Sequence, residues 1–400
     1  MTPPNTDTRA LVVAIALTTL VQALVSVAVF APPILAPVAQ ADLGVSASAI
    51  GIVITLMYVA ASLSAPRGGA LVARHGPLRV SQQALMWSAG GIALFAVASP
   101  VVCVIGAFML GIGYGPVTPA SSTILSTRAP DRLRNIIMSI RQTGVPLGGA
   151  IAGALVPTLI VNFGWRASAV TVGGLCALMA LAVQPKREYY DAGRSASTHA
   201  GRTSHLELLR LVFAAPALRD IALISFAYAA VQMCFTSYLV VFLTERAGLT
   251  LVTAGAVFSA AMIAGIVGRI LWGAVADYAS NARKVLGSLG LLMAACALAT
   301  TQVSAAWPYT GIVALAVVFG ASAIGWNGVF VAEVARIAPA GDIAKATGAT
   351  LGMTYFGVVV GPFIFWAIVA ATASYAIAFA AIGACALIAG LACFRNEAGQ

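Results

Sequence analysis

Charged residues are what this sequence has least of. Only 8% of its 400 residues are charged, whereas 60% are hydrophobic. A soluble globular domain carries about 25% charged residues, so a chain this poor in charge cannot cover a water-facing surface. Lipid therefore has to surround most of its length. The composition excludes a soluble enzyme or a soluble binding module.

The sequence is also poor in groups that hold metals or perform catalysis. Its three histidines stand outside the long apolar runs, and its six cysteines include no Cys-x-x-Cys pair. No His-Glu-x-x-His or Gly-x-Ser-x-Gly sequence is present. We therefore predict no enzymatic activity, no metal and no cofactor. The net charge of +10 is not gathered on one basic face, so nucleic acid is not an expected partner.

What the sequence does contain is a series of long uncharged runs. A helix needs about 20 apolar residues to cross a hydrocarbon core of about 30 Å. Runs long enough for one helix occupy 10–41, 43–66, 142–165, 167–185, 221–244 and 247–268, and runs long enough for two occupy 80–127, 285–332 and 346–394. Backbone amides in lipid need internal partners, and the period-2 pattern of a barrel is absent. We therefore predict twelve transmembrane helices.

Basic residues are concentrated in alternate loops. Most of the 22 lysine and arginine residues fall between the predicted helices on one side, and the loops of the other side hold only Arg166 and Arg246. Because positive loops remain in the cytoplasm, we predict a multi-pass protein of the cytoplasmic (inner) membrane with both termini cytoplasmic. The net charge then reflects topology and contact with anionic lipids of the bilayer.

The longest polar stretch, residues 186–205, lies near the middle of the chain. We predict an N-terminal half at 1–185, a cytoplasmic linker at 186–205 and a C-terminal half at 206–400. In both halves a Gly-rich helix precedes an Ala-Pro turn and then a helix with glycines four residues apart, such as Gly144 and Gly148 or Gly357 and Gly361. Such glycines predict close helix packing. Two repeated halves place a binding site at their interface, near the middle of the membrane.

Two loops carry a recognisable pattern. GALVARHGPLR (69–79) resembles the G-x-L-x-D-R-x-G-R-R loop of the major facilitator superfamily, and GAVADYASNARK (273–284) stands where the repeat requires its counterpart. Ala73 replaces the usual Asp of the first copy, whereas Asp277 keeps it in the second. GAFMLGIGYG (106–115) keeps the glycines of the family's fourth helix but has Ala107 where many members have Arg. The resemblance covers essentially the whole chain.

The resemblance implies an all-α membrane protein with two pseudo-symmetric six-helix bundles, which works by alternating access. It also implies that helices 1, 4, 7 and 10 line the cavity, that helices 2, 5, 8 and 11 form the contact between halves, and that helices 3, 6, 9 and 12 face lipid. A small organic anion, most simply a carboxylate, is the expected substrate, with protons as a possible coupling ion. We expect a monomer in the bilayer.

Arginines inside the predicted helices support an anionic substrate. Arg141 and Arg269 fall at similar depth on predicted helices 5 and 8, where a buried charge costs about 2.5–3.5 kcal/mol unless it is paired. A carboxylate between two guanidiniums suits their bidentate geometry. The residues around Arg269 also resemble helix 8 of the monocarboxylate and oxalate porters, where an arginine contacts the substrate. The alternative is that each arginine reaches the cytoplasmic face or caps a helix.

Other polar residues complete the candidate site. The predicted substrate contacts besides the two arginines are Gln22, Tyr58, Tyr114, Tyr228, Gln232, Asn327 and Tyr355, with Trp326 beside them. Each offers hydrogen-bonding atoms on an otherwise apolar surface, and each could equally bridge two helices. The predicted conformational latch contains Arg74, Asp277, Arg283, Glu333 and Arg336.

Glu333 has two interpretations. Burial would raise the pKa of its carboxyl group towards the range of a proton carrier. Its position near the cytoplasmic end of predicted helix 10, with Arg336 one turn later, favours a structural ion pair. The alternatives for the whole chain are efflux of drugs or metabolites within the same superfamily, and a membrane-embedded enzyme or channel. An exporter of cations would favour an acidic residue deep in the cavity, and an enzyme would need a catalytic cluster.

Overall fold

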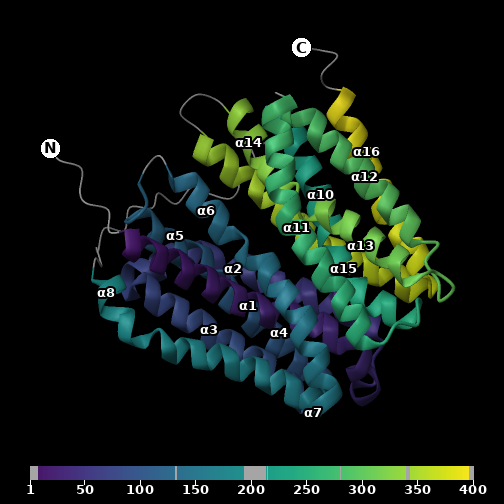
Figure 1. Cartoon of the computed structure of the whole chain (residues 1–400), viewed down its shortest axis with the longest axis horizontal. Coiled ribbons are helices and arrows are strands. Elements are labelled where there is room, and N and C mark those ends of the chain that lie inside the picture. The colour runs from purple at the N-terminus through teal and green to yellow at the C-terminus, as the bar shows by residue number, and fades with distance from the viewer. Residues whose placement is uncertain are drawn as a thin grey trace. The chain divides into compact units, whose positions relative to one another are not determined.

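The computed structural model describes residues 8–130, 133–192, 213, 215–279, 281–338 and 343–395 (Figure 1). Within these ranges every regular element is a helix, which confirms the predicted all-α class. The chain forms two compact units. The first contains Met1–Val45 and Leu56–Ala200, and the second contains Ser46–Thr55 and Gly201–Gln400.

The first unit is built from long apolar helices. They are α1 (Thr8–Leu43), α2 (Ile50–His75), α3 (Pro77–Leu94), α4 (Pro100–Tyr114), α5 (Val117–Ser126), α6 (Arg134–Gln142), α7 (Gly144–Ala182) and the short α8 (Arg187–Asp191). The first residues of α2 belong to the second unit. Apolar side chains cover most of these helices on all sides, as lipid-embedded helices require.

Helix α7 contains a sharp reversal at Gly164. Its backbone has φ 80° and ψ 162° there, a conformation that only glycine adopts without strain. Figure 1 shows the chain turning back within α7. Eleven stretches of the described chain are long and apolar enough to cross a membrane, and one of them, Ile136–Asp191, contains this reversal. It therefore holds the two helices predicted over 142–165 and 167–185.

The second unit has a similar succession of helices. They are α10 (Pro216–Glu245), α11 (Leu251–Ala279), α12 (Ala282–Thr300), α13 (Tyr309–Ala323), α14 (Asn327–Ile337), α15 (Ile343–Thr372) and α16 (Tyr375–Arg395). Helix α10 is the most buried, and it packs against α15 and α16. Phe235 and Tyr238 of α10 stack on Phe319 and Phe365, with ring centroids 4.4 and 4.1 Å apart.

Glycines permit the closest helix contacts, and they do so at matching places in the two units. A Cβ atom at Gly111 of α4 would meet the carbonyl oxygen of Met57 on α2, and one at Gly320 of α13 would meet that of Ala261 on α11. Each of these glycines stands 18 residues before the alanine of an Ala-Pro pair. The repeat seen in the sequence is therefore also a repeat in helix packing.

The glycines of α7 and α15 behave in the same way. A Cβ atom at Gly148 would meet the carbonyl oxygen of Ala23 on α1, and one at Gly357 would meet that of Phe226 on α10. The predicted role of these glycines in close packing is confirmed. Backbones that approach this closely gain van der Waals contact, which is the main source of helix association in lipid.

Candidate functional site

Within the described residues, three of the predicted membrane helices contain a local break in their regular hydrogen bonding, which we call an interruption, although the capping residues at each break keep helical φ and ψ. Predicted helix 4 is divided into α4 and α5 around Gly115 and Pro116, and predicted helix 10 is divided into α13 and α14 around Gly325. Predicted helix 5 changes from α6 to α7 at Thr143. Pro116 has no N–H group to continue the helical pattern.

Arg141 lies at one of these interruptions and is only 2% exposed. Its Nη2 donates a hydrogen bond to Oε1 of Gln22 at 2.6 Å, and both terminal nitrogens lie 3.4 Å from Oγ1 of Thr118. Nε2 of Gln22 in turn donates to Oγ of Ser26 at 3.2 Å. Gln22 and Thr118 are both neutral, and their oxygens orient the guanidinium.

Arg269 lies beside the interruption of predicted helix 10. Its Nε donates to the carbonyl oxygen of Ile324 at 3.2 Å, and the side chain is half-buried. Nδ2 of Asn327 lies 3.4 Å from the same carbonyl and 3.3 Å from Oε1 of Gln232. Nε1 of Trp326 also donates to that Gln232 oxygen at 3.0 Å. The structure thus gathers four of the polar residues named from sequence.

The two arginine sites occupy corresponding places in the repeat. Thr118 contacts Arg141 and Asn327 lies beside Arg269, and both stand 11 residues before the alanine of an Ala-Pro pair. In each unit one arginine therefore lies beside the start of the second segment of an interrupted helix, α5 in the first unit and α14 in the second, although the arginines themselves stand on α6 and α11. Binding of a single anion by Arg141 and Arg269 together stays a prediction.

The predicted tyrosines have different surroundings. Tyr58 is 6% exposed and packs edge-on against Tyr114, with ring centroids 5.7 Å apart. Tyr228 is fully buried, and its hydroxyl donates to the carbonyl oxygen of Leu286 at 2.7 Å. This bond joins α10 to α12, so helix packing accounts for Tyr228 and we leave it out of the proposed site. Tyr355 on α15 is 41% exposed.

Glu333 and Arg336 form an ion pair within α14. The Glu333 side chain is 1% exposed, and its two carboxylate oxygens accept from Nε and Nη2 of Arg336, each at 2.8 Å. Spacing by three residues brings the two side chains to one face of the helix. The structure therefore contains the ion pair expected from the sequence, and this pair occupies both oxygens of the candidate proton carrier.

The remaining latch residues differ in burial. Arg74 and Asp277 are exposed at the ends of α2 and α11. Arg283 is 5% exposed, and its Nη2 lies 3.9 Å from Oδ2 of Asp220. Asp220 also pairs with Arg219, which the sequence did not single out, at 3.5 Å. Among the predicted latch residues of the described chain, Arg283, Glu333 and Arg336 are thus the ones held by ion pairs.

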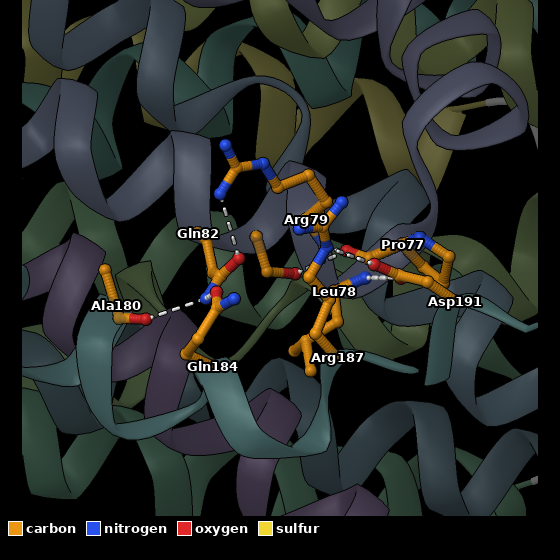
Figure 2. A network of polar contacts seen from close by, with 9 residues as sticks. Pro77, Leu78, Arg79, Gln82, Ala180, Gln184, Arg187 and Asp191 are labelled. Carbon is orange, nitrogen blue, oxygen red and sulfur yellow. Dashed lines mark hydrogen bonds and ion pairs between the residues drawn. The ribbon is translucent and has the colours of Figure 1, made fainter. Parts of the chain in front are cut away.

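Asp191 is a functional candidate that the sequence did not reveal. Its side chain is buried, and its two oxygens accept from the backbone N–H groups of Leu78 at 2.8 Å and Arg79 at 3.2 Å (Figure 2). Nε of Arg187 lies 3.6 Å away. The carboxylate therefore caps the N-terminus of α3, where Gly76 has no side chain to do so.

Residues 187–191 stand at the start of the predicted cytoplasmic linker. They form α8, which packs against α3. The rest of the expected linker, from 193 onward, lies outside the described residues. Arg128 at the end of predicted helix 4 also stacks on Tyr190 and Tyr189, with its Cζ 4.5 and 5.1 Å from the ring centroids. The one feature of the sequence that indicates the Asp191 cap is Gly76 before Pro77, because a helix that begins there has no capping side chain of its own.

Comparison with known proteins agrees with this architecture. The family model described as the Major Facilitator Superfamily matches residues 15–362. The Hexuronate transporter of Bacillus subtilis (strain 168) is 25% identical over 382 residues, which cover 90% of this chain and 89% of that protein. The Gallate transporter of Pseudomonas putida is 29% identical over 152 residues, but these are 37% of this chain and 33% of that protein.

A solved structure shows the same fold. The inward-facing, occupied form of a bacterial homolog of the human lysosomal transporter Spinster superposes with a TM-score of 0.78 at 15% identity, and the match covers 97% of each chain. At such low sequence identity, the match shows only that the two proteins share a fold.

Proposed function

The chain belongs to the major facilitator superfamily of transporters, and we propose that it moves a small organic carboxylate across the cytoplasmic (inner) membrane by alternating access. The observation that carries this proposal is the buried Arg141, which two neutral side chains orient at a helix interruption.

Arg141 supports an anionic substrate through the cost of its burial. A guanidinium within a membrane helix costs about 2.5–3.5 kcal/mol on insertion scales unless a partner compensates it. Among its contacts, Gln22 and Thr118 supply oxygen acceptors. A substrate carboxylate can add negative charge beside Arg141 and accept two parallel hydrogen bonds from the planar guanidinium.

Arg269 is the predicted substrate contact of the second unit. Its Nε donates to the carbonyl oxygen of Ile324, which fixes that edge of the guanidinium. Gln232 and Asn327 lie at the same helix interruption and can contact hydroxyl groups of the substrate. Alternating access is the transport mechanism that membership of this family implies.

Names of relatives support the same chemical class. The Hexuronate transporter and the Gallate transporter are both named for organic acids that are anions near neutral pH. A sugar acid and an aromatic acid share a carboxylate beside hydroxyl groups. We therefore propose a hydroxylated carboxylate as the substrate class.

Ligand-induced thermal stabilisation of the purified protein tests the proposal. Glucuronate, gallate and 4-hydroxybenzoate are the anionic probes, and glucose and methyl gallate are their neutral controls. We expect at least one carboxylate to raise the melting temperature while its neutral control does not. Stabilisation by hydrophobic cations alone would favour efflux of drugs and contradict the proposal.

Variants of the two arginines locate the binding site. Arg141→Ala and Arg269→Ala should each abolish the stabilisation, and the lysine variants should restore little of it because an ammonium lacks the planar two-point contact. Arg166→Ala is the matched control, since Arg166 pairs with Asp42 and is 56% exposed. Wild-type stabilisation in both alanine variants would show that the arginines are structural.

A further inference from the structure

A groove on the first unit is lined by residues other than those that contact Arg141. It has a volume of about 350 Å³ and is formed by α2, α3 and α4. Small side chains at Ala60, Ser64 and Ala84 leave the space, while Leu63 and Trp87 are among the apolar groups around it. A second cavity of about 350 Å³ along α3 shares Gln83 and Trp87 with the first.

The polar groups of the groove are basic or neutral. Arg67 contributes to the first cavity and Arg79 to the second. Arg67 donates to the carbonyl oxygen of Leu63 on its own helix at 2.6 Å, and Arg79 approaches Oε1 of Gln82 at 3.4 Å. In the part of the chain that the structure describes, neither arginine has a carboxylate partner.

Arg67 and Arg79 are expected at the same depth in the membrane. The uncharged run of the second predicted helix ends immediately before Arg67, and that of the third begins immediately after Arg79. Both guanidiniums therefore belong at the edge of the hydrocarbon layer, on the side predicted to be cytoplasmic. Trp87, eight residues after Arg79, lies about 12 Å further along α3 and so within the hydrocarbon.

The apolar part of the groove faces outward. Leu63 is 60% exposed, and Met86 and Trp87 of α3 are 52% and 43% exposed. A groove with cations at the headgroup level and apolar walls below matches an amphiphile with an anionic head and a hydrocarbon tail. A neutral headgroup would leave two arginines uncompensated beside lipid.

We propose that this groove binds an anionic phospholipid such as phosphatidylglycerol. Its phosphate contacts Arg67 and Gln83, with Arg79 beside them, and one acyl chain lies along Trp87. Such a lipid neutralises basic charge next to the loop between α2 and α3, and it fills a space that the helices leave open.

Quenching of tryptophan fluorescence by brominated lipids tests the proposal. The protein is reconstituted with brominated phosphatidylglycerol or brominated phosphatidylcholine, and the contribution of Trp87 is obtained by subtracting Trp87→Phe. We expect this contribution to be quenched at least about twofold more by the anionic lipid at equal content. Equal quenching by both lipids would overturn the proposal.

Two variants distinguish a specific lipid-binding site from general electrostatic attraction between the protein and anionic lipids. Arg67→Ala should lose the preference for phosphatidylglycerol, whereas Arg74→Ala should keep it, because Arg74 is exposed on the same helix outside the groove. Equal loss of the preference in both variants would show that it reflects only the overall positive charge of the protein surface, and would contradict the proposed site. Displacement of the lipid by millimolar inorganic phosphate would show a site for small anions and contradict the lipid assignment.

Discussion

At the scale of single residues, Asp191 has the best-defined role in the first unit. Its buried carboxylate accepts two N–H groups at the start of α3, and Gln82 reinforces the contact by donating to the carbonyl oxygen of Ala180 at 2.9 Å and to Oε1 of Gln184 at 2.7 Å. These bonds tie the start of α3 to the end of α7. Gly76 is needed here, because its φ is 91° and a Cβ atom would meet the Asp191 carboxylate.

Asp191→Ala should destabilise the protein by about 1–2 kcal/mol, because two N–H groups lose their acceptor in a buried place. Thermal unfolding in detergent measures the loss. Glu188→Ala is the control, since Glu188 is exposed on the same short helix. Equal melting temperatures for the two variants would mean that the cap contributes nothing.

Substitution of Glu333 distinguishes a structural role of this residue from a role in proton coupling. Its two oxygens are held by Arg336, so we expect Glu333→Gln to lower the melting temperature and to leave any dependence of transport on a proton gradient unchanged. Uptake into proteoliposomes with and without an inward proton gradient measures this. If the variant loses gradient-driven accumulation but keeps exchange, Glu333 is a proton carrier.

At the scale of helices, close contacts at glycine are the feature that both units share. Gly111→Ala should destabilise the protein by about 1–3 kcal/mol, because the new methyl group meets the Met57 carbonyl oxygen and forces α4 away from α2. Gly174→Ala provides the control, because no atom lies within 4 Å of its added Cβ. Thermal unfolding of both variants should show a loss for the first alone. An unchanged melting temperature for Gly111→Ala would contradict the close contact.

Helix positions were predictable from sequence because lipid imposes one simple condition, an uncharged run of sufficient length. The interruptions at Gly115 and Gly325 were not predicted, since each lies inside such a run and changes no charge. Gly164 reverses the chain between two runs that Arg166 had already separated. The helix at residues 187–191 was not predicted, because its sequence is polar and only the contact of Asp191 with α3 reveals its role.

The partners of the site residues were harder to predict than the residues themselves. Arg141 and Gln22 were both named from sequence, because a charge and an amide are conspicuous among apolar residues, but their contact joins positions 119 residues apart. Thr118 gave no signal, since threonines in membrane helices commonly bond to their own backbone. Asp191 lies 113 residues from Leu78, and only the folded unit brings them together.

At the scale of the whole molecule, our central proposal is that the protein exchanges an organic carboxylate across the membrane. Each unit holds an arginine beside a helix interruption, and the chain belongs to a family of transporters. A transporter of this kind binds its substrate alternately from either side, so it catalyses exchange even without an energy source.

Counterflow in proteoliposomes tests this claim most directly. Vesicles are loaded with unlabelled glucuronate or 4-hydroxybenzoate and diluted into the same labelled compound. We predict transient accumulation of label for at least one carboxylate in the wild-type protein and none in Arg141→Ala, with Arg166→Ala behaving as wild type. Accumulation that is equal in wild type and Arg141→Ala, or that occurs with hydrophobic cations and with no carboxylate, would contradict the account.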